Sequence, residues 1–132
     1  MRIAFTVPTL PVAQPRAKAT AINGKARMYE AKKEHPIHTF KATIRLAAAQ
    51  LHAGEPEKGA LGARLTFVFP MKKKARIHKA TKPDVDNLAK GVLDTLNGLL
   101  YVDDGQVADL TIRKWHAGAD EQPHVEICVW TL

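Results

Sequence analysis

The stretch KPDVDNLAKGVLDTLNGLLYVDDGQVAD, residues 82–109, decides how this chain is organised. Its first part predicts a helix that begins at Asp84 to Asp86 and runs to about Leu96, because apolar residues recur there at helical spacing. The Asn-Gly dipeptide at 97–98 is a strong signal for the end of a helix. An apolar piece then leads into a turn, Asp-Asp-Gly, at 103–105. The positions expected to face the core are Val85, Leu88, Val92 and Leu96.

Strands and a second helix are predicted on either side of this stretch. Before it, the segments Arg2–Val7 and Ala63–Phe69 have the pattern of strands, and the proline that follows the second one should end it. An apolar stripe between Pro36 and His52 predicts a helix. After the stretch, Val107–His116 and Val125–Leu132 read as two further strands. The order strand, helix, strand, helix, strand, strand predicts an α+β fold, in which a mixed sheet packs with helices.

The length and composition indicate one globular domain, residues 1–132. Hydrophobic residues make up 45% of the chain and charged residues 25%, which excludes a wholly disordered protein. A single cysteine, Cys128, excludes a disulfide framework and a Cys-rich zinc site, and it suits a reducing cytoplasm. The sequence shows no membrane-spanning run and no signal-peptide pattern. We therefore expect a cytoplasmic protein without a membrane partner.

The charge is unevenly distributed along the chain. The formal net charge of +7 combines residues 1–82, which hold 17 Lys and Arg against 4 Asp and Glu, with residues 83–132, which hold 3 against 9. A basic first part indicates a polyanionic partner, because Lys and Arg neutralise phosphates and release counterions. The acidic remainder would repel such a partner unless its carboxylates hold metal ions. The alternative is a basic protein with acids scattered over its surface.

Six aspartates fall within residues 82–109, and two of them bracket one residue at the predicted helix start. On a regular helix, side chains two residues apart point about 200° away from each other. Both carboxylates turn toward one point only if the first lies in the extended segment after Pro83. Either one alone is also typical of a helix cap. The six are Asp84, Asp86, Asp94, Asp103, Asp104 and Asp109.

The acidic pair at 103–104 is typical of a turn, and it is also placed to return to the head of the preceding helix. Converging carboxylates from separate segments provide the hard oxygen ligands that Mg²⁺ needs. Lys90 lies four residues after Asp86 and so shares its helical face. It forms either an ordinary surface ion pair or a group that reaches a metal site. Spacing alone leaves both interpretations open.

This stretch resembles the signature of the RusA-type Holliday junction resolvases, endodeoxyribonucleases that are common in prophages. The family pattern is Asp-x-Asp-Asn-Leu, a Lys four residues after the second Asp, and an Asp-Asp pair before Gln. The resemblance is strong over residues 82–109 and weaker over VPTLPVAQPRAKAT at 7–20 and TFVFP at 66–70. Every element of the pattern is present, as Asp84, Asp86, Asn87, Leu88, Lys90, Asp103, Asp104 and Gln106.

The resemblance implies a homodimeric, Mg²⁺-dependent endonuclease that acts in DNA recombination and repair. It would resolve four-way junctions by paired symmetric nicks that leave 5′-phosphate and 3′-hydroxyl ends. Mn²⁺ is the other ion that such ligands would accept, and no small-molecule cofactor is implied. The implied metal ligands are Asp84, Asp86 and Asp104, with Lys90 as the essential lysine and with Asp103 and Asn87 beside the ligands.

Basic residues flank the acidic stretch. We expect the loop before it, and the Pro-rich segment after the first strand, to contact phosphates, because Lys and Arg beside a metal-binding cluster can hold the DNA backbone. The alternative for such a loop is an ordinary solvated surface. The residues expected to bind DNA are Arg16, Lys18, Lys72, Lys73, Lys74, Arg76, Lys79 and Lys82.

Two other functions are compatible with parts of the sequence. A non-catalytic nucleic-acid-binding protein would use the same acids as caps and turns. A metal-dependent phosphohydrolase would act on mononucleotides, and the basic loop argues against it. The absence of serine excludes a serine nucleophile. Four further residues have ordinary structural interpretations: local packing or surface placement for His35 and His38, and core or dimer packing, in preference to base stacking, for Trp115 and Trp130.

Overall fold

The computed structural model describes residues 1–15, 19–22, 25–28 and 32–132. Within these ranges, a mixed sheet of five strands has the spatial order β1 (Arg2–Val7), β7 (His124–Thr131), β4 (Leu61–Lys73), β6 (Val107–Gly118) and β5 (Ile77–His78). A separate antiparallel pair consists of β2 (Ala19–Ile22) and β3 (Lys25–Met28). The helices of this part of the chain are α1 (Ile37–Leu51), α2 (Val85–Thr95) and the short 3₁₀ helix η1 (Asp104–Gln106).

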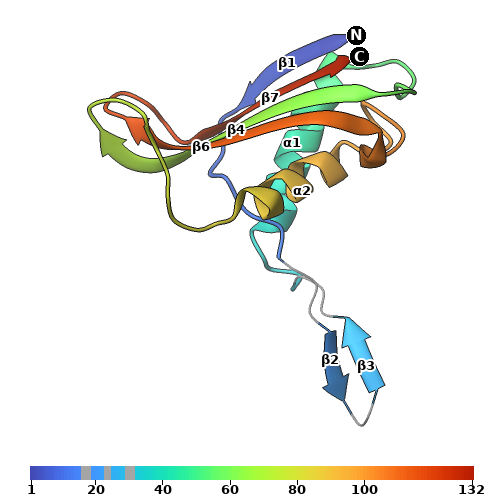
Figure 1. Cartoon of the computed structure of the whole chain (residues 1–132), viewed down its shortest axis with the longest axis horizontal. Helices are drawn as coiled ribbons and strands as arrows, with labels where there is room; N and C mark the ends of the chain where they lie inside the picture. Colours follow the sequence, from blue (N-terminus) through green and yellow to red (C-terminus); the bar gives the residue numbers. More distant parts are fainter. Residues whose placement is uncertain (16–18, 23–24, 29–31) are drawn as a thin grey trace.

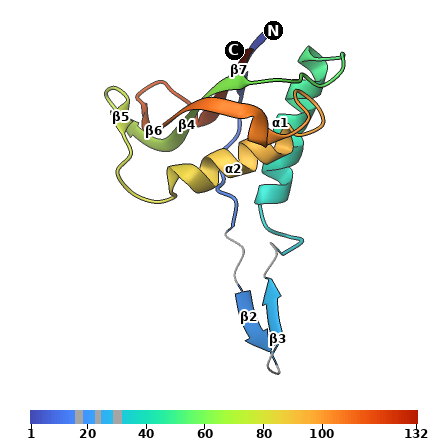
Figure 2. The same cartoon turned by 45° about the vertical axis from the view of Figure 1, so that its right-hand side comes forward.

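Both α-helices pack against the same face of the five-stranded sheet, and no described element covers the other face (Figures 1 and 2). The predicted α+β class is confirmed, because a single compact domain combines a mixed sheet with helices. The β2–β3 pair, which the sequence did not predict, extends away from the sheet (Figure 1). None of the described helices is long and apolar enough to cross a membrane.

The sheet is mixed because β4 pairs in parallel with β6 and antiparallel with β7. A parallel pair needs a crossover connection, and α2 lies within the connection between β4 and β6. The helix therefore runs opposite to these two strands. Its first residues lie near the edge where β6 ends, and its last residues lie near the edge where β6 begins (Figure 2).

The hydrophobic core lies between the helices and the inward side of the sheet. Phe40 of α1 and the predicted positions Val92 and Leu96 of α2 are buried there. Val85 is 39% exposed, so its predicted place in the core is wrong. As the first residue of α2, it precedes the point at which the helix meets the sheet. Tyr101 is the largest fully buried side chain among the described residues.

Three predicted boundaries differ from the observed ones. β4 continues past Pro70 to Lys73, and a register shift in its pairing with β6 between Phe69 and Lys73 accommodates the proline. The predicted basic loop contains the two-residue edge strand β5. The predicted turn at 103–105 consists of the N-cap residue Asp103 and the first two residues of η1.

The two tryptophans lie on the uncovered face of the sheet and outside the hydrophobic core, so the prediction of core packing is wrong for both. Dimer packing and base stacking stay untested. The indole ring of Trp130 occupies the space next to Gly62 where a side chain would begin, which explains the glycine at that position. Cys128 alternates with core residues of β7 and is 5% exposed, so it is a small buried residue.

Candidate active site

The N-terminal acidic pair, Asp84 and Asp86, lies where α2 begins. Asp84 is the N-cap residue and has extended backbone, with φ −73° and ψ 145°. Its carboxylate makes no capping hydrogen bond to the helix. Both residues are exposed. Because only Asp86 belongs to the regular helix, the separation of about 200° between two helical residues that are two apart does not apply to this pair.

Lys114 of β6 holds the segment that leads into the acidic pair. Its ammonium group donates hydrogen bonds to the carbonyl oxygens of Thr81 at 2.7 Å and of Pro83 at 2.8 Å. The backbone N–H of Lys79 donates to the carbonyl oxygen of Lys114 at 3.1 Å. These charge-assisted bonds fix the approach to Asp84. No sequence pattern indicated this role, because a lysine within a strand is usually an exposed surface residue.

The Pro-rich segment after β1 also reaches the start of α2. The backbone N–H of Gln14 donates to the carbonyl oxygen of Asn87 at 3.0 Å. Asn87, expected beside the metal ligands, therefore links this segment to the helix. The predicted DNA-binding residues Arg16 and Lys18 follow in sequence and lie outside the described residues.

At the other end of α2, Asp103 is built into the local backbone structure. Its Oδ2 accepts a hydrogen bond from the N–H of Gly105 at 2.9 Å, and its own N–H donates to Oε1 of Gln106 at 2.9 Å. This reciprocal arrangement is a capping box at the start of η1. Asp103 thus stabilises the turn that carries Asp104.

Asp104 lies next to the residues that end α2. Its Oδ1 accepts a hydrogen bond from Nδ2 of Asn97 at 3.3 Å. The buried hydroxyl of Tyr101 donates to the carbonyl oxygen of Leu93 at 2.6 Å. Burial raises the pKa of Tyr101, and the charges of Asp104, Asp94 and Asp103 raise it further. These three aspartates therefore form a C-terminal acidic group around one end of the helix.

The predicted metal ligands are divided between the two ends of α2. The helix has 11 residues and is therefore about 16 Å long. Asp84 and Asp86 lie at its start, whereas Asp104 contacts Asn97 beyond its last turn. The sequence places the 103–104 pair where it could return to the start of α2. Within one chain, the pair lies instead at the other end of this helix. Among the described residues, no three His, Cys, Asp or Glu side chains are grouped closely enough to hold a metal ion.

Lys90 lies on the exposed side of α2, between the two acidic groups. Its side chain is 60% exposed, and its ammonium group is 3.1 Å from Oδ2 of Asp94. The structure shows a surface ion pair of Lys90 with Asp94, four residues further along the helix. Such a solvated pair contributes only about 0.2–0.5 kcal/mol.

The basic segment at 72–82 is partly tied to the sheet. Nε of Arg76 lies 2.7 Å from Oε2 of Glu121, and Nη2 lies 2.7 Å from Oε2 of Glu126. Lys79 donates to Oγ1 of Thr81 at 2.9 Å. The side chain of Lys72 lies outside what the structure describes. The predicted DNA-binding residues that are exposed in this segment are Lys73, Lys74 and Lys82.

His35 and His38 have local hydrogen-bond partners. Nδ1 of His35 accepts a hydrogen bond from the N–H of Ile37 at 3.0 Å, and Nε2 of His38 lies 2.9 Å from the carbonyl oxygen of Lys32. These contacts confirm the expectation of local packing and surface placement.

Comparison with known proteins concerns nearly the whole chain. Residues 8–129 match the family described as endodeoxyribonuclease RusA. This chain belongs to the RusA family. It is also 37% identical over 140 residues to the uncharacterized protein YqaN of Bacillus subtilis (strain 168), an alignment that covers 96% of this chain and 94% of YqaN. The resemblance of residues 82–109 to RusA resolvases is confirmed.

Membership of the RusA family makes the protein an endodeoxyribonuclease, a hydrolase that acts on phosphodiester bonds. RusA enzymes are Holliday junction resolvases with roles in recombination and repair, and they act on branched DNA. They generally depend on a divalent metal. The family match includes all the acidic residues around α2.

Proposed function

We propose that this RusA-family protein resolves four-way DNA junctions by two symmetric, Mg²⁺-dependent nicks. The observation that carries the proposal is the exposed pair Asp84 and Asp86, placed where an extended segment enters α2. A basic segment precedes this pair directly in sequence. Carboxylates that bind Mg²⁺ and lysines that bind phosphates are the two components that phosphodiester hydrolysis needs at one place.

The carboxylates around α2 suit Mg²⁺ in their chemistry, but one chain does not gather all of them. Asp84 and Asp86 supply two hard oxygen ligands, and Asp104 lies at the far end of the helix. In a homodimer with antiparallel α2 helices, the partner subunit's Asp104 would approach Asp84 and Asp86. A two-fold axis near the middle of α2 builds two such sites at once. We therefore assign each metal site to both subunits.

When bound, Mg²⁺ activates a water molecule for in-line attack and neutralises charge on the phosphoryl group. Lys90 contributes from the exposed side of α2, where its ammonium group exchanges Asp94 for the scissile phosphate. Asp103 holds the turn that carries Asp104, and the backbone of Asn87 holds the Pro-rich segment. The products would be a 5′-phosphate and a 3′-hydroxyl.

The basic residues around the helix start would position the DNA backbone. Lys73, Lys74 and Lys82 are exposed and precede the acidic pair, so they are available to phosphates. Arg76 serves a second purpose, because its ion pairs with Glu121 and Glu126 anchor this segment to the sheet. Two sites related by symmetry would then cut two opposite strands of a four-way junction.

The test is cleavage of a synthetic four-way junction by the full chain with and without Mg²⁺. We expect wild type to make two symmetric nicks, and we expect Asp84→Asn and Asp86→Asn each to lower the rate by about 10²- to 10³-fold. Asp109→Asn is the matched control, because Asp109 is an exposed aspartate of β6 outside the site. Wild type that binds the junction without nicking it, or Asn variants as fast as wild type, would contradict the proposal and favour a non-catalytic binding protein.

The acidic pair should also affect binding in the absence of metal. Two carboxylates beside the basic segment repel the phosphates of DNA when no cation neutralises them. In chelator, Asp84→Asn and Asp86→Asn should therefore bind the junction more tightly than wild type while failing to cut it. A titration in which these variants bind more weakly would contradict this expectation.

A further inference from the structure

The uncovered face of the sheet carries two arginines on neighbouring strands. Arg64 of β4 and Arg113 of β6 project from this face, because their neighbours Leu65 and Ile112 point toward the core. Both arginines are exposed. Neither guanidinium group makes a hydrogen bond or an ion pair in the part of the chain that the structure describes. The two positive charges are therefore available to a partner outside the chain.

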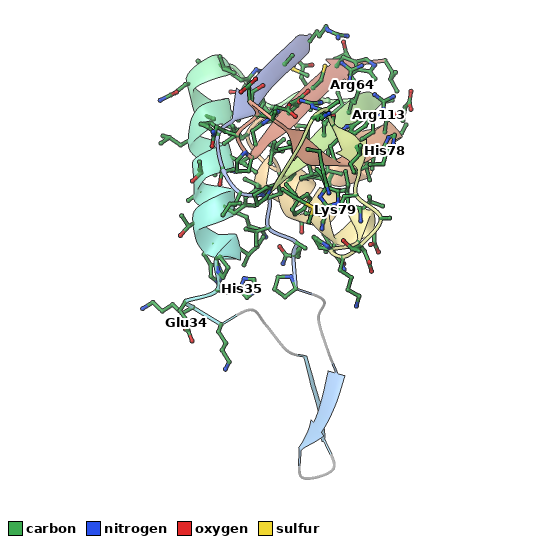
Figure 3. All side chains as sticks on the ribbon, turned by 90° about the vertical axis from the view of Figure 1, so that its left-hand side faces the viewer. Glu34, His35, Arg64, His78, Lys79 and Arg113 are labelled. Atoms are coloured by element: carbon green, nitrogen blue, oxygen red, sulfur yellow. The ribbon has the colours of Figure 1, made fainter. Side chains whose placement is uncertain are left out.

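The two arginines begin a diagonal that leads toward the active site. Arg113 lies two residues beyond the partner of Arg64 on the adjacent parallel strand. His78 of β5 takes the next place, where its ring stacks on Trp115 with a centroid distance of 3.9 Å. Figure 3 shows Arg64, Arg113 and His78 in this order along the side of the sheet away from α1. From this open-face stripe (Arg64, Arg113 and His78), five residues lead to Asp84.

Among the described residues, the acidic side chains on this face, Glu126 and Asp109, form no ion pair with Arg64 or Arg113. Glu126 is compensated, because its Oε2 lies 2.7 Å from Nη2 of Arg76 and 2.8 Å from Nε2 of His124. Asp109 lies two residues before Thr111, the β6 partner of Arg64, and forms no ion pair among the described residues. A shallow pocket of about 240 Å³ opens between Arg64 and Glu126. This part of the uncovered face is therefore polar and carries two exposed arginines.

We propose that the open-face stripe binds the phosphate backbone of a duplex DNA arm that leaves the active site. The inference rests on the proposed junction-cleaving function and extends it to a surface outside the catalytic residues. Arginine suits this task, because its guanidinium group is always charged and presents a planar set of donors to phosphate oxygens. The stripe would place this duplex arm between the start of α2, the edge strand β5 and the uncovered face of the sheet.

Charge argues for DNA on this face and against a second copy of the chain. A two-fold axis that passes through the stripe would bring Arg64 and Arg113 close to their own copies in the partner subunit, and like charges at an interface are unfavourable. A polyanion meets both arginines with opposite charge. The stripe should therefore change affinity and its salt dependence while the rate of cutting by bound enzyme stays the same.

The experiment compares Arg64→Gln/Arg113→Gln with a charge-matched control, Lys41→Gln/Lys58→Gln. Lys41 on α1 and Lys58 before β4 lie outside the stripe. Binding of the full chain to four-way junctions is titrated in chelator at several salt concentrations. One junction has arms of about 20 base pairs, and another has arms of about 5 base pairs, too short to reach from the active site across the sheet at roughly 3.4 Å per pair.

On the long-armed junction, the arginine variant should bind about tenfold more weakly than wild type, and the slope of log Kd against log salt should fall by about 2. The lysine control should change this slope by less than about 0.5. On the short-armed junction, the two variants should bind alike. Arg64→Lys/Arg113→Lys keeps both charges and should keep the slope, which separates loss of charge from loss of folding.

Equal binding of the arginine and lysine variants to the long-armed junction would overturn the inference. So would an arginine variant that loses its dimer in sedimentation while its salt slope is unchanged, because the face would then be a contact between copies. Failure of the proposed function is distinguishable. Wild type would bind junctions, and the stripe would affect that binding, but Mg²⁺ would produce no nicks.

Discussion

Aspartates lie at both ends of α2, but their surroundings differ. At its start, Asp84 and Asp86 are exposed, and the backbone before them is held by Lys114. At its end, the carboxylates of Asp103 and Asp104 are tied to nearby residues, one to a backbone N–H and the other to a side-chain amide. The first end presents two exposed carboxylates, and the second end uses one carboxylate of its pair to hold the turn that carries the other.

The helix dipole explains why the second end needs more support. The last turn of a helix carries partial negative charge, which repels nearby carboxylates. Cationic and amide donors compensate for this charge. Arg45 of α1 donates to the carbonyl oxygen of Thr95 at 2.8 Å and of Asn97 at 3.3 Å, and Lys90 pairs with Asp94. At the first turn the dipole has the opposite sign, so it favours acidic side chains there.

The largest expected effect tests whether the start of α2 in one subunit and the end of α2 in its partner together form each metal site. Asp84→Asn and Asp104→Asn homodimers should each nick a four-way junction about 10²- to 10³-fold more slowly than wild type. Mixing the two variants should restore nicking, because one site of each heterodimer then has both native aspartates. With random exchange of subunits, we expect about a quarter of the wild-type nicking rate. The measurement is nick formation before and after subunit exchange.

The pattern of nicks provides the control for this complementation. A heterodimer with one intact site should cut one strand and leave the symmetric strand uncut. Asp84→Asn mixed with Asp86→Asn should recover nothing, because both changes fall at the same end of α2. If the first mixture also recovers no activity, each site uses the aspartates of one chain, and the intersubunit arrangement is wrong.

The next effect concerns Lys90, which lies between the two ends. Lys90→Met should lower the nicking rate by about 10²-fold if its ammonium group contacts the scissile phosphate. Its unfolding free energy should change by less than about 0.5 kcal/mol, because the exposed pair with Asp94 contributes little. Asp94→Asn removes the same ion pair but keeps the lysine, so its nicking should stay close to wild type. Equal losses in both variants would show that only the ion pair matters.

The elements predicted from the sequence are those with a clear apolar period of their own. α2 was placed correctly because its buried positions and its Asn-Gly end lie within 15 residues, and β1 was placed because its six residues alternate. β5 has only two residues, too few to show any period. The continuation of β4 past Pro70 depends on its pairing with β6, which is distant in sequence.

The candidate site shows the same limit. The sequence pointed to the aspartates and Lys90 as candidates, and extended backbone at Asp84 is one of the alternatives that it left open. It did not show that Asp104 lies at the opposite end of α2, because that follows from the direction of the helix relative to β4 and β6. It also gave no indication of Lys114, whose two carbonyl partners become its neighbours only when the sheet forms.

Lys114 tests the support of the first end and should have an intermediate effect. Lys114→Met frees the carbonyl oxygens of Thr81 and Pro83, so the segment before Asp84 should become less well fixed. We expect about a tenfold lower nicking rate, together with a several-fold rise in the Mg²⁺ concentration needed for half-maximal rate. Lys114→Arg should restore most of both quantities. An unchanged Mg²⁺ requirement in Lys114→Met would show that Lys114 does not position the acidic pair.

The smallest expected effect on nicking separates the two neighbouring aspartates of the second end. Asp103→Ala removes the acceptor for the N–H of Gly105 and should lower the unfolding free energy by about 1 kcal/mol, with less than about a tenfold loss of nicking. Asp104→Ala removes only a long bond from Asn97, so it should leave stability nearly unchanged and abolish nicking. Thermal unfolding and junction cleavage measured on both variants check this reversal. If Asp103→Ala loses activity and Asp104→Ala loses stability instead, the two assignments are exchanged: Asp103 then serves the metal, and Asp104 holds the turn.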